Sequence, residues 1–217
     1  MADFSARRTA MVDTQVRPSD VTKFPVIGAM LHVAKEDFVH AHQRETAYVG
    51  ENIPLGGDRV VLEPRTLGKM LDGLNIQPGE TVLDLGCGLG YSSAVIAHMA
   101  EVVIAIEDQD ALASEAQEIL ARAGADNVAV QTGALSEGDP KHGPYDVITI
   151  QGGVEIVPPS VLDQLRDGGR IGAIFVSPGL AVCKIGHKSN GIVTWRYAFN
   201  GGAPVLRGFE KHQEFAL

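Results

Sequence analysis

The strongest constraint on this fold is a short strand that runs into a glycine-rich turn and then into a helix. Thr81–Leu85 is an apolar run of strand length, the turn 86–90 has glycine at every second position, and a helical pattern runs from about Tyr91 to Met99. A buried parallel strand has such a nearly continuous apolar run. The sequence therefore predicts that this segment lies at the centre of an α/β domain.

More strands and helices alternate along the rest of the chain. Apolar strand-like runs occupy 102–106, 128–131, 145–150 and 170–176; the helical patterns between them lie at 111–123 and 161–165, and Gly168–Gly169 is predicted as a turn. This alternation is typical of a doubly wound α/β fold with a mostly parallel sheet. Only turn residues separate the last runs, at 180–185, 192–199 and 204–209, which predicts antiparallel strands at the C-terminus.

The N-terminal part has a different pattern. Apolar positions at helical spacing predict one helix from Phe4 to Gln15 and a second that starts at an N-cap on Thr22. A short strand at 59–62 and a helix that starts at Thr66 complete this part. We expect one domain over residues 1–217, with a helical and loop segment (1–78), a central core (79–178) and antiparallel C-terminal strands (179–217).

Charge and composition narrow the class of protein. There are 18 Lys and Arg against 27 Asp and Glu, a formal charge of −9, which disfavours a nucleic-acid partner. No apolar run approaches the roughly 18 residues of a membrane span, and the charged start lacks the apolar core of a signal peptide. Two distant cysteines, Cys87 and Cys183, suggest reduced thiols. We therefore expect a cytoplasmic protein, with no metal site, because the cysteines and histidines, His212 included, lack metal-ligand spacing.

The glycine turn also predicts a ligand. Backbone NH groups of such a turn face the crevice where a parallel sheet binds its ligands. A dinucleotide fingerprint requires glycine at Tyr91, so that ligand is not favoured. Asp84 before the turn and Glu107 after the next strand suit an ammonium group and a ribose diol. Together they favour S-adenosylmethionine, although glycines that merely permit a tight turn remain the alternative. Cys87 is interpreted as a small space-filling residue.

Several motifs outside and within the turn carry a family resemblance. They are Met11–Gln15, Ala29–Met30, Lys35–Val39, Ala47–Tyr48, Pro54–Gly56, Glu63–Pro64, Val82–Tyr91, Asn127–Val128, Gln164–Leu165 and Gly168–Arg170. In these motifs, from about Met11 to Val176, the chain resembles the protein-L-isoaspartate O-methyltransferase family of S-adenosylmethionine-dependent enzymes. The resemblance implies a Rossmann-like methyltransferase fold. It also implies that Gly86, Gly88, Glu107 and Asp108 line the cofactor site. We expect the same site to include Asp84, Cys87, Gly90, Tyr91, Ala134 and Leu135.

Two positions depart from the family pattern. The family resembles Ile-Ser-Gln-Pro or Ile-Ser-Ala-Pro where this chain has Val61-Leu62-Glu63-Pro64, so the serine beside the substrate carboxylate is replaced by Leu62. The family's Gly-Asp-Gly is replaced by Gly133-Ala134-Leu135, which removes a carboxylate expected near the adenine amine. Loss of one hydrogen bond at Ala134 leaves cofactor binding possible. Leu62 alters the substrate wall itself, so we expect a different methyl acceptor.

The remaining candidates concern that acceptor. If it is a hydroxyl, amine or thiol, Glu63 is the first candidate for a general base, and Gln151 lies where substrates of such folds arrive. Arg59 and Arg65 could orient an anionic small molecule or a protein carboxylate, or merely balance nearby acids. Two alternatives stay open: a true isoaspartyl repair enzyme, and a non-catalytic binding module. The helices from Phe4 to Val39 could cover the substrate or form a homodimer.

Overall fold

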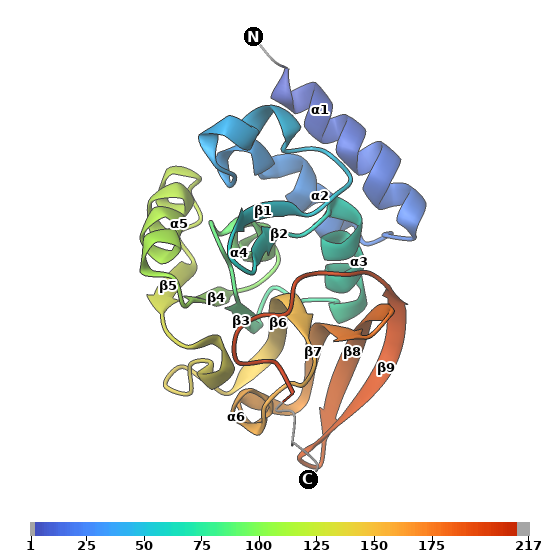
Figure 1. The fold of residues 1–217 in the computed structure, drawn as a ribbon, viewed down its shortest axis with the longest axis vertical. Coiled ribbons are helices and arrows are strands. Elements are labelled where there is room, and N and C mark those ends of the chain that lie inside the picture. The colour runs from blue at the N-terminus through green and yellow to red at the C-terminus, as the bar shows by residue number, and fades with distance from the viewer. Residues whose placement is uncertain (1–2, 212–217) are drawn as a thin grey trace.

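A seven-stranded sheet forms the centre of the computed structural model, which describes residues 3–211 (Figure 1). The strands lie in the order β5-β4-β3-β6-β7-β8-β9. Their bounds are β3 Thr81–Leu85, β4 Val102–Glu107, β5 Val128–Thr132, β6 Tyr145–Val154, β7 Leu165–Ser177, β8 Leu180–Ser189 and β9 Ile192–Asn200. Strands β3 to β7 pair in parallel, and β8 and β9 pair antiparallel. The predicted mostly parallel sheet with antiparallel C-terminal strands is confirmed.

The two faces of the sheet are covered differently. The helices are α1 Phe4–Met11, α2 Phe24–His32, α3 Pro64–Leu74, α4 Tyr91–Ala97, α5 Asp110–Arg122 and α6 Pro159–Asp163. Because side chains alternate along a strand, Val82 of β3 packs in the cluster that contains α2 to α5, whereas Leu83 packs in the cluster that contains α6. Leu206 and Phe209 of the C-terminal segment complete that second cluster.

The order of strands creates a crevice at the carboxyl end of β3. Strand β3 has β4 on one side and β6 on the other, and chain connections leave it in opposite directions there. A hairpin of β1 (Ile53–Gly56) and β2 (Arg59–Val61) forms a separate two-stranded sheet close to β6. The ribbon shows this hairpin above the ends of the central strands (Figure 1). The sequence predicts β2 but not its partner β1.

Four local predictions are wrong. The second helix has Lys23 rather than Thr22 at its N-cap, because the helix begins one residue later, at Phe24, and the backbone NH groups of residues 22 and 23 donate to Asp72. The helix predicted to start at Thr66 starts at Pro64, which is pre-shaped for a first helical turn. Gly168–Gly169 lies within β7 rather than in a turn. Residues 204–209 form no antiparallel strand: Val205 makes a single parallel bridge with Gly153 of β6.

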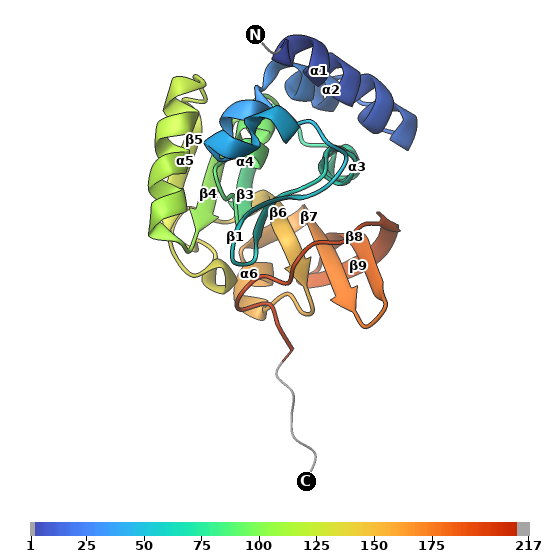
Figure 2. The ribbon, with the colours of Figure 1, turned by 45° about the horizontal axis from the view of Figure 1, so that its top comes forward.

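The N-terminal helices lie together at one end of the molecule, where α1 contacts α2 (Figure 2). A turn of π-helix, Val12–Val16, and a 3-10 turn, Arg17–Ser19, continue from α1. Among residues 3–211 no helix is both long and apolar enough to cross a bilayer. Residues 1–2 and 212–217, with His212 and the end of the predicted C-terminal segment, lie outside the described residues.

Candidate functional site

The glycine turn between β3 and α4 has a backbone that requires glycine. Gly86, Gly88 and Gly90 have φ values of 75°, 57° and 93°. A Cβ at Gly88 would lie 2.6 Å from Cδ1 of Leu55, and one at Gly90 would lie 2.9 Å from Cδ1 of Leu120. Side chains other than glycine are therefore disfavoured both by the left-handed backbone and by close packing. The interpretation that these glycines permit a tight turn holds, whatever ligand the turn binds.

Asp84 at the end of β3 is saturated by hydrogen bonds from this chain. The hydroxyls of Ser92 and Ser93 each donate to Oδ2 at 2.6 Å, and Thr149 Oγ1 and Gln151 Nε2 each donate to Oδ1 at 2.7 Å. The carboxylate is fully buried. Burial raises the pKa of Asp84, and these four donors oppose the rise. Asp84 therefore fixes the start of α4 and the end of β6 rather than presenting a free carboxylate to a ligand.

Glu107 at the tip of β4 is held by one arginine and three backbone NH groups. Nε of Arg59 lies 2.9 and 3.0 Å from its two oxygens, and the NH groups of residues 88, 108 and 109 also donate to it. Arg59 is itself fully buried and also pairs with Asp58 and Asp108. Burial raises the pKa of Glu107 while Arg59 opposes that rise. Of the two roles considered for Arg59, the structure shows the balancing of nearby acids.

The C-terminal segment 203–209 covers part of the crevice. Its backbone exchanges hydrogen bonds with Gly153 of β6, and the NH of Arg207 donates to Asp58 at 2.8 Å. Leu206 is fully buried, and its methyl groups lie within 3.3 Å of a Cβ placed on Gly86 or Gly152. This segment crosses in front of the central strands (Figure 1). Apolar side chains of this chain thus fill space above the glycine turn.

A very small cavity lies between the β2 hairpin, the glycine turn and β6. Its volume is about 10 Å³, and its lining is Val60, Val61, Leu62, Leu67, Cys87, Tyr91, Ser92 and Gln151. Half of the lining is aliphatic, because Val60, Val61, Leu62 and Leu67 supply no hydrogen-bonding side chain, whereas Tyr91, Ser92 and Gln151 are its polar members. Burial raises the pKa of Cys87 well above its usual value, which agrees with a space-filling role. Leu62 and Gln151, predicted separately, therefore meet at one cavity.

Two predicted site residues do not reach this cavity. Glu63 is at the N-cap of α3, where its carboxylate accepts a hydrogen bond from Thr66 Oγ1 at 2.6 Å. Arg65 donates to the carbonyl oxygen of Asn200 and stacks on Phe199. They are not among the residues that line the cavity.

The other predicted residues lie at the carboxyl ends of the strands. Asp108 follows β4, and Ala134 precedes a 3-10 turn, Leu135–Glu137, after β5. Leu135 packs against Gly86. Sequence reasoning missed Ser92, Ser93, Thr149, Arg59 as the partner of Glu107, and Leu206. Only the serines had a local signal, because hydroxyls in the first turn after a glycine loop are placed to reach the preceding strand.

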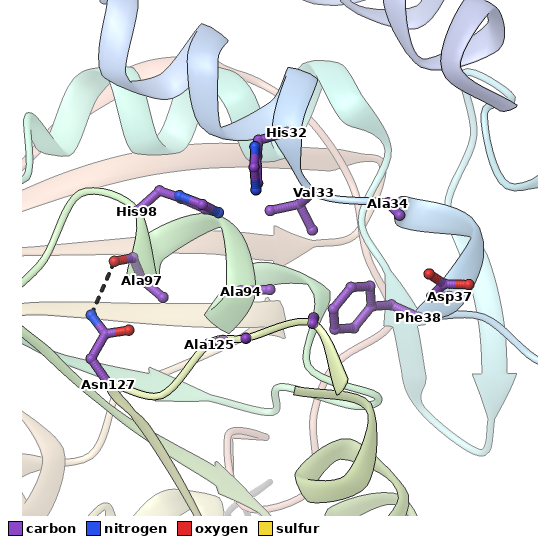
Figure 3. A pocket seen from close by; sticks show the side chains of 12 residues that line it. His32, Val33, Ala34, Asp37, Phe38, Ala94, Ala97, His98, Ala125 and Asn127 are labelled. Atoms are coloured by element: carbon purple, nitrogen blue, oxygen red, sulfur yellow. Dashed lines mark hydrogen bonds between the residues drawn. The ribbon is translucent and has the colours of Figure 1, made fainter. Parts of the chain in front are cut away.

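A second cavity lies at the opposite ends of the strands. Its volume is about 220 Å³, and it is lined by residues that include His32, Phe38, His98 and Asn127 (Figure 3). Asn127 and His98 precede β5 and β4, so this cavity is at the amino ends, away from the glycine turn. The rings of His32 and His98 are 4.6 Å apart between centroids. Within residues 3–211, no group of three or more His, Cys, Asp or Glu side chains could hold a metal ion.

Comparison with known proteins gives a consistent result. Residues 6–190 match the family model of protein-L-isoaspartate(D-aspartate) O-methyltransferase. The protein-L-isoaspartate O-methyltransferase of Koribacter versatilis is 32% identical over 88% of this chain and 86% of its own. Protein-L-isoaspartate O-methyltransferase 1 of Rhodopseudomonas palustris is 37% identical over 77% of this chain and 69% of its own.

A solved structure supports the fold. The putative protein-L-isoaspartate O-methyltransferase of Plasmodium falciparum, in complex with S-adenosyl-L-homocysteine, superposes with a TM-score of 0.80 at 18% identity. It covers 95% of this chain and 99% of its own. With the family match over residues 6–190, the chain belongs to the protein-L-isoaspartate(D-aspartate) O-methyltransferase family and is an S-adenosylmethionine-dependent methyltransferase.

Proposed function

We propose that this enzyme transfers the methyl group of S-adenosylmethionine to an acceptor less polar than the isoaspartyl carboxylate. The observation that carries the proposal is the aliphatic lining at Val60, Val61 and Leu62, beside Gln151. A site that recognises a carboxylate needs hydrogen-bond donors, and aliphatic groups cannot supply them. An apolar metabolite with a nucleophilic hydroxyl, amine or thiol fits this lining better.

The residues at the crevice have the chemical groups that would bind the cofactor. Glu107 is a carboxylate at the place suited to a ribose diol, and Gly86, Gly88 and Gly90 have no side chains of their own to block the turn. Arg59 donates a hydrogen bond to the carboxylate of Glu107, and Leu206 covers Gly86. Binding of the cofactor therefore requires both side chains to move. Ala134 and Leu135 after β5 and Asp108 after β4 would then line the rest of the cofactor site.

Bound there, S-adenosylmethionine supplies an electrophilic methyl group for in-line displacement. The chain's own contribution is positioning and exclusion of water. Gln151 is held by its hydrogen bond to Asp84, which leaves its amide oxygen as an acceptor for a proton on the nucleophile. Gln151 orients the nucleophile but, as a neutral amide, takes up no proton. The proton released by a hydroxyl, amine or thiol would pass to the carboxylate of Glu63 once that group leaves Thr66, or to solvent. Leu62 and Tyr91 form the wall that keeps water out.

True isoaspartyl repair is the second candidate, and the names of the curated relatives favour it. One comparison separates the two. Wild-type enzyme, Leu62→Ser and the matched apolar variant Leu62→Val are assayed with labelled S-adenosylmethionine and an isoaspartyl peptide. A hydrogen bond to a charged group contributes about 1.5–3 kcal/mol, so the serine is expected to raise peptide methylation by roughly 10- to 100-fold.

The second arm of the test uses extracts. We expect wild-type enzyme to label a component of an organic-solvent fraction of cell extract and to leave the peptide unlabelled. If the wild type methylates the peptide efficiently and Leu62→Ser brings no gain over Leu62→Val, the altered acceptor is wrong and the repair function stands. Equilibrium dialysis with S-adenosyl-L-homocysteine shows independently that each variant retains the cofactor site.

A further inference from the structure

Two buried polar groups without hydrogen-bond partners meet behind the wall of the small cavity. Lys35 is 0% exposed and Tyr91 is 2% exposed. Neither Nζ of Lys35 nor the hydroxyl of Tyr91 finds a hydrogen-bond partner among residues 3–211. Nζ of Lys35 lies 5.7 Å from the centroid of the Tyr91 ring. Unpartnered groups of this kind are rare in folded proteins because their desolvation is costly, and they concentrate at functional sites.

Tyr91 links this pair to the proposed reaction. It directly follows Gly90, starts α4 and lines the cavity together with Leu62 and Gln151. A cavity of about 10 Å³ holds about one water molecule at most, so an acceptor group enters only if a wall moves. No hydrogen bond within the described chain anchors the Tyr91 hydroxyl. Its ring is held by packing against Phe38, at 5.9 Å between centroids, and by Lys35.

Charged groups surround the pair on several elements. Glu63, just before α3, is the opposite charge that acts on Lys35. Burial lowers the pKa of Lys35 to about 7, and Glu63 opposes that shift. On the other side, Tyr91 lies within electrostatic reach of Arg8, Glu36 and Tyr48. These three are hydrogen-bonded to one another, since Arg8 donates to the Tyr48 hydroxyl and Tyr48 donates to Glu36.

We propose that Lys35 is a positioning residue that controls entry of the acceptor by holding the ring of Tyr91 in the cavity wall while its amine is charged. An ammonium group is attracted to the face of an aromatic ring, whereas a neutral amine is not. In the charged form the ring stays in place and the cavity is narrow. In the neutral form the ring can move and the acceptor enters. This inference rests on the proposed placement of the acceptor beside Leu62.

The enzyme should therefore respond to pH near neutrality. As the amine loses its proton, kcat/KM for the acceptor rises by roughly 5- to 30-fold, the range expected from a desolvated cation–π contact. Lys35→Met removes the charge and gives high values at every pH. Lys35→Arg keeps the charge throughout this range and gives low values at every pH. Lys69→Met is the matched control, because Nζ of Lys69 lies 5.6 Å from the ring centroid of Phe199, away from the cavity.

The test combines these pH profiles with a measurement that needs no acceptor. In nuclear magnetic resonance titrations from pH 5.5 to 9, the Tyr91 ring signals should follow the Lys35 Cε signal with one midpoint. In Lys35→Met the Tyr91 signals should stay unchanged, and in Lys69→Met they should follow the wild type. Binding of S-adenosyl-L-homocysteine should differ less than twofold between wild type and both Lys35 variants.

Two results would overturn the proposal. One is a Tyr91 ring that does not respond to the Lys35 titration. The other is a Lys35→Met enzyme that keeps the wild-type pH profile. Failure to find an acceptor would contradict the proposed function only. The nuclear magnetic resonance titration of the Tyr91 ring needs no acceptor and would still decide the role of Lys35, so failure of one proposal can be told apart from failure of the other.

Discussion

Replacing Arg59 by methionine tests the buried ion pair at the crevice most directly. The guanidinium is fully buried, and so is Glu107, whose oxygens lie 2.9 and 3.0 Å from Nε. Removing one partner of such a pair leaves an uncompensated buried charge, which typically costs 3–5 kcal/mol. Asp58 and Asp108 also lose their cation in this variant. We therefore expect Arg59→Met to lower the free energy of unfolding by about 4 kcal/mol at pH 8.

The loss should depend on pH in a defined direction. Without Arg59, nothing but backbone NH groups opposes the rise that burial produces in the pKa of Glu107. A carboxyl group with a raised native pKa binds more protons in the native than in the unfolded state, so stability falls as pH rises. The deficit of Arg59→Met should thus shrink by about 1–3 kcal/mol between pH 8 and pH 5, as Glu107 takes up a proton.

Urea unfolding followed by the fluorescence of the single tryptophan, Trp195, measures these differences. Arg122→Met is the control, because the Arg122–Glu118 pair is exposed and should contribute less than about 0.5 kcal/mol. The double variant Arg59→Met/Glu107→Gln should lose less stability than the sum of the losses in the two single variants. A loss under about 1 kcal/mol that is equal at both pH values would refute a desolvated pair.

Three more predictions follow from buried positions. Lys35→Met should stabilise the protein by up to about 4 kcal/mol at pH 7, because the pKa of the amine falls from 10.5 to about 7 on folding. This gain in stability should vanish toward pH 10. Urea titrations measure it, and the control variant Lys141→Met, at an exposed position, should show no such gain. Gly153→Ala places a Cβ 2.6 Å from the carbonyl oxygen of Ala203 and should cost about 2–4 kcal/mol by detaching the C-terminal segment, whereas Gly79→Ala, with open space around it, should change the thermal midpoint little. Leu206→Ala should cost about 2–5 kcal/mol through the cavity left against Gly152, and a smaller change in calorimetry would mean that the segment is loosely packed.

The central part of the fold could be predicted because its signals are local. Each buried parallel strand is one apolar run, and the glycine turn after β3 carries its own backbone requirement at Gly86, Gly88 and Gly90. Gly168–Gly169 shows the limit of that reasoning. A Cβ on Gly169 would lie 2.9 Å from the carbonyl oxygen of Asp146, so this glycine permits close approach of two strands rather than a turn.

Contacts between distant segments gave no comparable signal. Arg59 and Glu107 are 48 residues apart, and nothing near either residue indicates the other. Strand β1 was missed because Pro54 and Gly56 look like a turn, although both lie within the strand. The run 204–209 has the apolar character of a strand but lies over β6 instead of pairing along the sheet edge, and only the tertiary structure decides between these arrangements.

The two carboxylates predicted for the cofactor differ in their ability to exchange partners. Asp84 has four donors from α4 and β6, three of them hydroxyls, in a fully buried site. Glu107 shares its arginine with Asp58 and Asp108, so Arg59 can leave one carboxylate and remain paired with two others. We therefore expect a ligand to exchange more easily with the partner of Glu107 than with the partners of Asp84. Because Arg59 lies three residues before Leu62 in the sequence, we expect that exchange to influence the proposed acceptor wall as well.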